Sequence, residues 1–182
     1  MTEEKTIREE LLEMVKTKAV IRGEIILSSG QKSNFYIDGK QVTLDPRGLL
    51  LLAKTVLSML HGTSADSIGG PTLGADPIAA AVALLSSQTG KPLKAFIVRK
   101  EAKKHGTQKM VEGPSIRAGD KVVIVEDVVT TGASILKAVE EIEKLKAKVV
   151  KIICLLDRKQ GAEETLSAYH YSPIFNLADV GL

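Results

Sequence analysis

Apolar residues follow two spacings along the chain, and each spacing predicts one type of secondary structure. A repeat of three to four residues, typical of a helix with one buried face, occupies positions 2–16, 46–60, 77–85 and 135–145. Short apolar runs rich in β-branched residues predict strands at 66–69, 94–98, 122–125, 149–156 and 169–175. Residues 19–27 and 34–38 are expected to form a hairpin around a Ser/Gly-containing turn.

The order of these elements predicts an α/β fold with a mainly parallel sheet flanked by helices. The length of 182 residues and the hydrophobic content of 44% suit one domain, residues 1–182, with a substantial core. The amino-terminal hairpin and the carboxyl-terminal strand are expected to form a small hood subdomain, to which residues 1–40 and 160–182 contribute.

Composition narrows the functional classes. The formal net charge is only +3, and most basic residues are spread along the chain, which argues against general nucleic-acid binding. No apolar run approaches the length of a membrane span, so no membrane association is expected. The single cysteine, Cys154, lies in an apolar run and predicts a buried thiol in a cytoplasmic protein.

The segment 122–134 is the most informative part of the chain. An apolar strand leads into Glu126 and Asp127, and a turn with Thr130, Thr131 and Gly132 then opens a helix. Free N–H groups at a helix N-terminus bind phosphate, and the hydroxyls of the turn add hydrogen bonds. The two acids are placed to accept hydrogen bonds from ribose hydroxyls or to face a hydrated Mg²⁺. Taken singly, the same hydroxyls are ordinary helix caps and the acids ordinary solvated groups.

A second charged segment, residues 98–106, carries four cations and a histidine directly after a predicted strand. Such a cluster is often a solvated surface, but beside a phosphate-binding motif it favours an anionic ligand. The polar stretch 101–118 that follows is long for a connection without secondary structure, so we expect a loop near 99–113 to close over the site.

Four segments together resemble a known family. Residues 122–134 resemble the phosphoribosyl pyrophosphate (PRPP) motif of type I phosphoribosyltransferases, and Arg-Lys-Glu-x-Lys-x-His-Gly at 99–106 resembles the loop of orotate phosphoribosyltransferases. Residues 155–161, with Leu-Asp-Arg, and 27–38 are similar to further segments of that family. The resemblance implies the type I fold and transfer of phosphoribose from PRPP to orotate in pyrimidine biosynthesis. It also implies Mg²⁺ as cofactor and a homodimer with shared active sites.

The resemblance also implies roles for individual residues. Lys103, His105 and Asp127 would be catalytic, with Mg²⁺ held through PRPP and water and no direct protein ligand. Orotate would contact Thr130, Arg158, Tyr36 and Ile37, and the pyrophosphate would face Thr72, Leu73 and Gly74. The residues expected to bind PRPP are Arg99, Lys100, Lys103, His105, Glu126, Asp127, Val128, Val129, Thr130, Thr131, Gly132, Ala133 and Ser134. Whether Lys103 or His105 donates a proton or only neutralises charge stays open.

Each assignment has a plainer alternative. Arg158 could form a structural ion pair, Tyr36 and Ile37 could be core residues, and residues 69–77 could be a simple strand-to-helix turn. The chain also lacks two lysines common in the family, one at Ser28 and one within 72–74, for which Lys32 or Lys40 are candidate replacements.

Two rival functions remain at this stage. One is a phosphoribosyltransferase for another base, which the segments around Tyr36 and Arg158 disfavour. The other is a non-catalytic PRPP-binding regulator. Only about one helix precedes the first strand, which is too little for a helix-turn-helix, and the Lys103/His105 segment favours catalysis.

Overall fold

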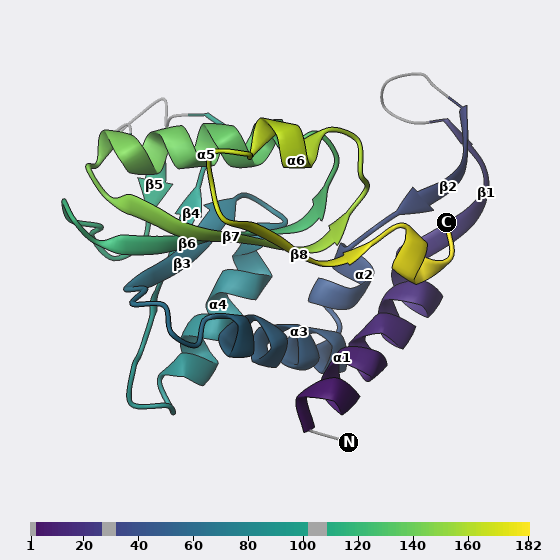
Figure 1. Ribbon diagram of the computed structural model, residues 1–182, viewed down its shortest axis with the longest axis horizontal. Helices are drawn as coiled ribbons and strands as arrows, with labels where there is room; N and C mark the ends of the chain where they lie inside the picture. The colour runs from purple at the N-terminus through teal and green to yellow at the C-terminus, as the bar shows by residue number, and fades with distance from the viewer. Residues whose placement is uncertain (1–2, 27–31, 102–108) are drawn as a thin grey trace.

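The computed structural model describes residues 3–26, 32–101 and 109–182 (Figure 1). Its helical segments are α1 (Glu3–Met14), the π-helical turn η1 (Val15–Ala19), α2 (Lys40–Thr43), α3 (Pro46–Met59), α4 (Ala75–Ser86), α5 (Ala133–Lys144), α6 (Ala162–Thr165) and the 3₁₀ turn η2 (Ala178–Val180). Its strands are β1 (Val20–Ile26), β2 (Lys32–Ile37), β3 (Ser67–Pro71), β4 (Lys94–Val98), β5 (Val111–Glu112), β6 (Lys121–Val129), β7 (Lys148–Asp157) and β8 (Tyr171–Asn176).

Six strands form one sheet in the order β5-β4-β3-β6-β7-β8, and β1 pairs with β2 in a separate antiparallel hairpin. Within the large sheet only β5 runs antiparallel to its neighbour. The predicted α/β fold with a mainly parallel sheet is therefore confirmed. The carboxyl ends of the parallel strands meet at one edge, where ligands of such sheets bind.

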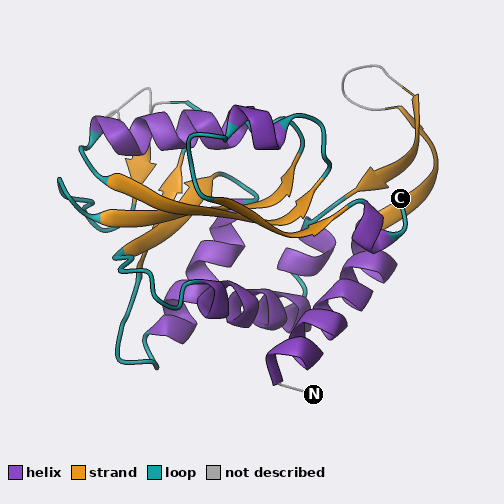
Figure 2. Cartoon of the chain, viewed as in Figure 1, coloured by secondary structure: helices purple, strands orange, loops and turns teal. Residues whose placement is uncertain are grey.

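Alternation along β6 explains why helices cover both faces of the sheet. Val123 and Val125 pack into a core cluster with α1, α3 and α4, whereas Val122 and Ile124 pack into a second cluster with α5 and α6. The figures show this layering, with α5 and α6 above the sheet and α1, α3 and α4 below it (Figures 1 and 2). A strand buried on both faces needs an unbroken apolar run, as found here.

The structure corrects the predicted role of the carboxyl-terminal strand. This strand was expected in the hood, but β8 pairs in parallel with β7 and forms an edge of the main sheet. The physical reason is that β7 continues as far as Asp157, so its backbone offers a partner along the full length of β8. Only the residues after β8 return to the hairpin, where Gly181 O accepts a hydrogen bond of 3.1 Å from Arg22 Nη2.

Two further boundaries differ from the sequence-based expectation. Strand β6 extends to Val129, past the predicted end at 125, because β7 pairs with it up to Val129 and Asp157. Both acids therefore lie inside the strand. The predicted loop 101–118 contains β5, which pairs with β4, and the short helices α2 and α6 were not predicted. In the described part of the chain, no helix has the length and apolar character needed to cross a membrane.

The packing predicts a strong difference between two leucines. Leu52 of α3 is 1% exposed, whereas Leu84 of α4 is 68% exposed. We expect Leu52→Ala to lower the free energy of unfolding by about 2–5 kcal/mol, because it removes buried methyl groups and leaves a cavity. Leu84→Ala should change it by less than about 1 kcal/mol. Urea denaturation of both variants tests this, and equal losses would contradict the assigned burial.

Candidate active site

The main candidate site is a pocket of about 750 Å³ at the carboxyl ends of β3, β4 and β6. It gathers ten of the residues predicted from the sequence, namely Thr72, Leu73, Gly74, Arg99, Lys100, Glu126, Asp127, Val128, Ala133 and Ser134. Lys40, Met110 and Lys137 also line it, together with Glu140 and Glu141. Segments far apart in the sequence thus meet at one place, as the parallel sheet requires.

The two acids of β6 form the floor of this pocket. Glu126 and Asp127 are each only 7% exposed. Glu126 Oε1 accepts a hydrogen bond of 3.1 Å from the Asp127 N–H, and Asp127 Oδ1 accepts one of 2.7 Å from the Val128 N–H. Asp127 Oδ2 is buried and has no hydrogen-bond partner among the described residues, although Lys40 Nζ lies 3.6 Å away. This oxygen can accept a hydrogen bond from a ligand hydroxyl.

Burial and charge perturb the first of these acids. Burial, reinforced by the negative charge of Asp127, raises the pKa of Glu126 to about 9. Glu126 is therefore protonated near neutral pH and can donate a hydrogen bond as well as accept one. The two neighbouring carboxyl groups thus offer different hydrogen-bonding chemistry to a ligand.

Two glycines allow separate segments to approach these acids closely. A Cβ at Gly74 would collide with Glu126 Oε1 and Asp127 Oδ1, and a Cβ at Gly39 would lie 2.9 Å from Asp127 Oδ2. Any larger residue would force the loop or the carboxylates to move. The loop 72–74 is therefore more than a turn, because it packs directly on the carboxyl groups.

The turn between β6 and α5 leaves backbone donors available. Gly132 is the N-cap of α5, has a φ of 82°, and makes no side-chain capping hydrogen bond. Among the described residues, the hydroxyls of this turn therefore do not act as ordinary helix caps of α5. Uncapped N–H groups at a helix start form an anion-binding site. Ser134 and Ala133 line the pocket, whereas Val129 is 2% exposed and packs in the core.

Two of the residues predicted to bind orotate, Thr130 and Arg158, lie at this turn, and none of the four lines the 750 Å³ pocket. The Arg158 N–H donates to Val129 O at 2.8 Å, which places Arg158 next to Thr130. Its guanidinium carbon is 5.8 Å from the centre of the Phe35 ring, and its buried Nε has no partner in the part of the chain that the structure describes. A buried guanidinium N–H without a partner is suited to a ligand oxygen.

The two hairpin residues predicted to bind orotate differ in burial. Ile37 is 5% exposed and belongs to the core cluster, and Tyr36 is 39% exposed. The residue that contacts Arg158 is Phe35, to which the sequence analysis gave no role. The available signal was strand alternation, because neighbouring residues of β2 point to opposite sides.

The cationic segment is described only in part. Arg99 donates from Nε to Glu101 O at 3.2 Å, and its Nη1 lies 3.7 Å from Glu112 Oε1. Lys100 is exposed and lines the pocket. Lys103 and His105, like Ser28, lie outside the described residues, so their roles stay predictions.

The comparisons with known proteins agree with this geometry. A family model described as Phosphoribosyl transferase domain matches residues 51–176, so the fold and the pocket define a phosphoribosyltransferase. An orotate phosphoribosyltransferase from a Nostoc species is 43% identical over 177 residues, which cover 96% of this chain and 85% of the relative. The chain belongs to the orotate phosphoribosyltransferase family.

Solved structures place the chain in the same family. The orotate phosphoribosyltransferase of Mycobacterium tuberculosis in complex with Fe(III) dicitrate is 38% identical, with a TM-score of 0.86 over 97% of this chain and 99% of that one. A structure of the M. tuberculosis enzyme in complex with PRPP is 35% identical, with a TM-score of 0.81 and the same coverage.

The raised pKa of Glu126 predicts a specific pH dependence of stability. The folded state holds the proton up to about pH 9, while the unfolded carboxyl releases it near 4.5, so stability should fall as pH rises between these values. Glu126→Gln should remove at least about 1 kcal/mol of this decline. The matched control is Glu140→Gln, at an exposed carboxyl of the same pocket. Urea denaturation at pH 5.5 and 8.5 measures both, and an unchanged decline in Glu126→Gln would contradict the assignment.

Proposed function

We propose that this chain transfers the 5-phosphoribosyl group of PRPP to orotate, giving orotidine 5′-monophosphate and pyrophosphate in pyrimidine biosynthesis. The observation that carries the proposal is the meeting of the buried acids, the uncapped start of α5 and the loop 72–74 in one pocket. These are the groups that a ribose, a phosphate and a pyrophosphate require. Membership of the family supports orotate over other bases.

The geometry supports one orientation of PRPP. The 5-phosphate would bind the N–H groups at the start of α5, near Ser134. The ribose hydroxyls would donate to Asp127 Oδ2, the buried oxygen without a hydrogen-bond partner. The pyrophosphate would lie between the loop 72–74 and the cations Arg99 and Lys100. The ribose ring would then lie across Glu126 and Asp127, with its anomeric carbon inside the pocket.

Orotate is proposed to bind on the side of Arg158. Its carboxylate or a ring carbonyl would accept from the Arg158 guanidinium, whose Nε has no partner in the described structure. The backbone hydrogen bond from Arg158 to Val129 brings this side chain next to Thr130. A planar guanidinium pairs well with a planar carboxylate, which favours orotate over uracil.

In the reaction, a ring nitrogen of orotate loses its proton to solvent and forms a bond to the anomeric carbon, while the bond from that carbon to the pyrophosphate oxygen breaks and its electron pair leaves with pyrophosphate. The sugar becomes oxocarbenium-like and the leaving group gains negative charge. We propose that Lys103 and His105 stabilise this charge, as the family resemblance implies. Closure of the loop near 99–113 would exclude water, which would otherwise hydrolyse the activated sugar.

Mg²⁺ is proposed as cofactor. The described residues hold no group of three or more His, Cys, Asp or Glu side chains that could bind a metal directly. Mg²⁺ would therefore be held through PRPP and water, and the buried acids would face its hydration shell while the ion neutralises phosphate charge. A homodimer with shared active sites and a cytoplasmic location complete the proposal, the latter supported by the buried free thiol of Cys154.

The function is tested by orotate consumption, followed by absorbance with PRPP and Mg²⁺ present. Wild-type protein should consume orotate, and uracil, hypoxanthine and adenine should not react. Lys103→Ala should lower kcat by about 100-fold or more while PRPP still binds. Lys148→Ala, at an exposed lysine that begins β7, is the control and should leave kcat unchanged. PRPP binding without turnover of any base would instead favour the regulator.

The orotate assignment predicts a selective defect in Arg158→Lys. Lysine keeps the charge but loses the planar pair of donors. We expect the KM for orotate to rise by about 10-fold or more, with the KM for PRPP within about twofold of wild type. Equal rises in both KM values would argue that Arg158 has only a structural role.

A further inference from the structure

Lys40 is not among the residues that were expected above to bind PRPP. It begins the short helix α2, lines the 750 Å³ pocket, and has a side chain that is 44% exposed. Its Nζ lies 3.2 Å from Asp38 Oδ1 and 3.6 Å from Asp127 Oδ2. The ammonium therefore bridges the end of the hairpin and the buried acid pair.

The backbone around Lys40 is firmly held. The Asp38 N–H donates to Ala19 O at 2.9 Å, and Gly39 packs against Asp127. Val42 and Thr43 of α2 are both fully buried. The start of α2 is thus fixed against the acids, and a long flexible side chain at position 40 places its charge within the pocket.

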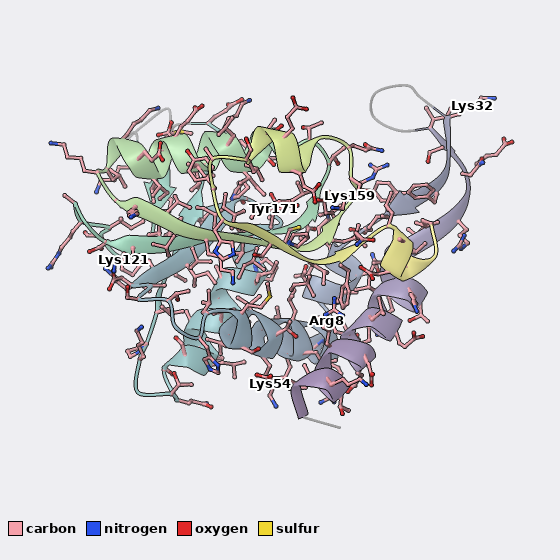
Figure 3. The ribbon with its side chains drawn as sticks, in the orientation of Figure 1. Arg8, Lys32, Lys54, Lys121, Lys159 and Tyr171 are labelled. Carbon is pink, nitrogen blue, oxygen red and sulfur yellow. The ribbon has the colours of Figure 1, made fainter. Side chains whose placement is uncertain are left out.

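Lys32, the other candidate replacement for the absent family lysines, lies elsewhere. It begins β2, is exposed, and projects from the outer end of the hairpin (Figure 3). It does not line the candidate active-site pocket. Of the two lysines, only Lys40 has its ammonium in the candidate active site.

The two oxygens of Asp127 indicate which part of PRPP Lys40 faces. Asp127 Oδ1 lies against Gly74 of the pyrophosphate loop, and Oδ2 faces Lys40. At the start of α5, the proposed site of the 5-phosphate, the hydrogen-bond donors are backbone N–H groups, so no lysine is required there. A ribose hydroxyl that donates to Oδ2 would have its neighbouring anomeric oxygen, and hence the pyrophosphate, within reach of the Lys40 ammonium.

We infer that Lys40 is a PRPP-binding residue whose ammonium contacts the pyrophosphate group beside Asp127. The inference rests on the proposed function, because it takes PRPP as the ligand of this pocket. A further cation near the leaving group adds to the charge that Arg99 and Lys100 supply. A charged donor close to phosphate oxygens forms a strong hydrogen bond.

The test compares three variants of the full chain. Lys40→Met removes the charge and keeps the aliphatic chain, and Lys40→Arg restores a cation. Gln41→Ala is the matched control, since Gln41 Nε2 donates to the same Asp38 at 3.0 Å from the same helix but does not line the pocket. Circular-dichroism melting establishes that each variant is folded, and Lys40→Gln replaces Lys40→Met if that variant does not fold.

The readouts are calorimetric binding of PRPP and of pyrophosphate with Mg²⁺, and the KM values for both substrates. We expect Lys40→Met to weaken binding of both ligands and to raise the KM for PRPP by about 10-fold or more. The KM for orotate should stay within about twofold. Lys40→Arg should recover most of the binding, and Gln41→Ala should resemble wild type.

Two outcomes would overturn the inference. Wild-type pyrophosphate binding by Lys40→Met would exclude the contact, and an equal defect in Gln41→Ala would show that the effect arises from the position of α2. Failure of the proposed function would give a different result from these two outcomes. The wild-type protein would then bind PRPP in a Lys40-dependent manner without consuming orotate.

Discussion

The burial of two adjacent carboxyl groups at the end of β6 is the constraint on which the site depends. Glu126 and Asp127 lie within a strand that is covered on both faces, where a charged pair is costly. The structure meets this cost through backbone N–H donors, a retained proton on Glu126 and the nearby ammonium of Lys40. Gly39 and Gly74 let their segments approach these groups, and Lys40 compensates their charge.

The same constraint explains the glycines on either side of the acids. Gly39 and Gly74 come from segments separated by a long stretch of chain, yet both touch Asp127. Their missing side chains leave space for the carboxylates and bring backbone close to the ligand. The hairpin, through α2, and the loop before α4 are thereby fixed relative to β6. A polar site of this kind needs tight packing around it to keep its groups in place.

The sequence predicted the sheet and most of the pocket because both depend on local patterns. The apolar runs of β3, β4, β6 and β7 and the acid pair after Val125 are visible without coordinates. The end of β6 and the placement of β8 were missed because they depend on pairing with β7. The contact between Phe35 and Arg158 was missed because it is a tertiary contact, which joins β2 of the hairpin to the residue that follows β7 of the main sheet.

The backbone hydrogen bond between Arg158 and Val129 has a consequence for the size of ligand that fits. It ties the residue that follows β7 to the last residue of β6, and the anion-binding turn begins one residue later. In the proposed binding mode, the separation between the phosphate end and the base end of the ligand would be set by the two adjacent strands β6 and β7. In the proposed binding mode, the fit of one pentose between phosphate and base would therefore follow from the spacing of β6 and β7.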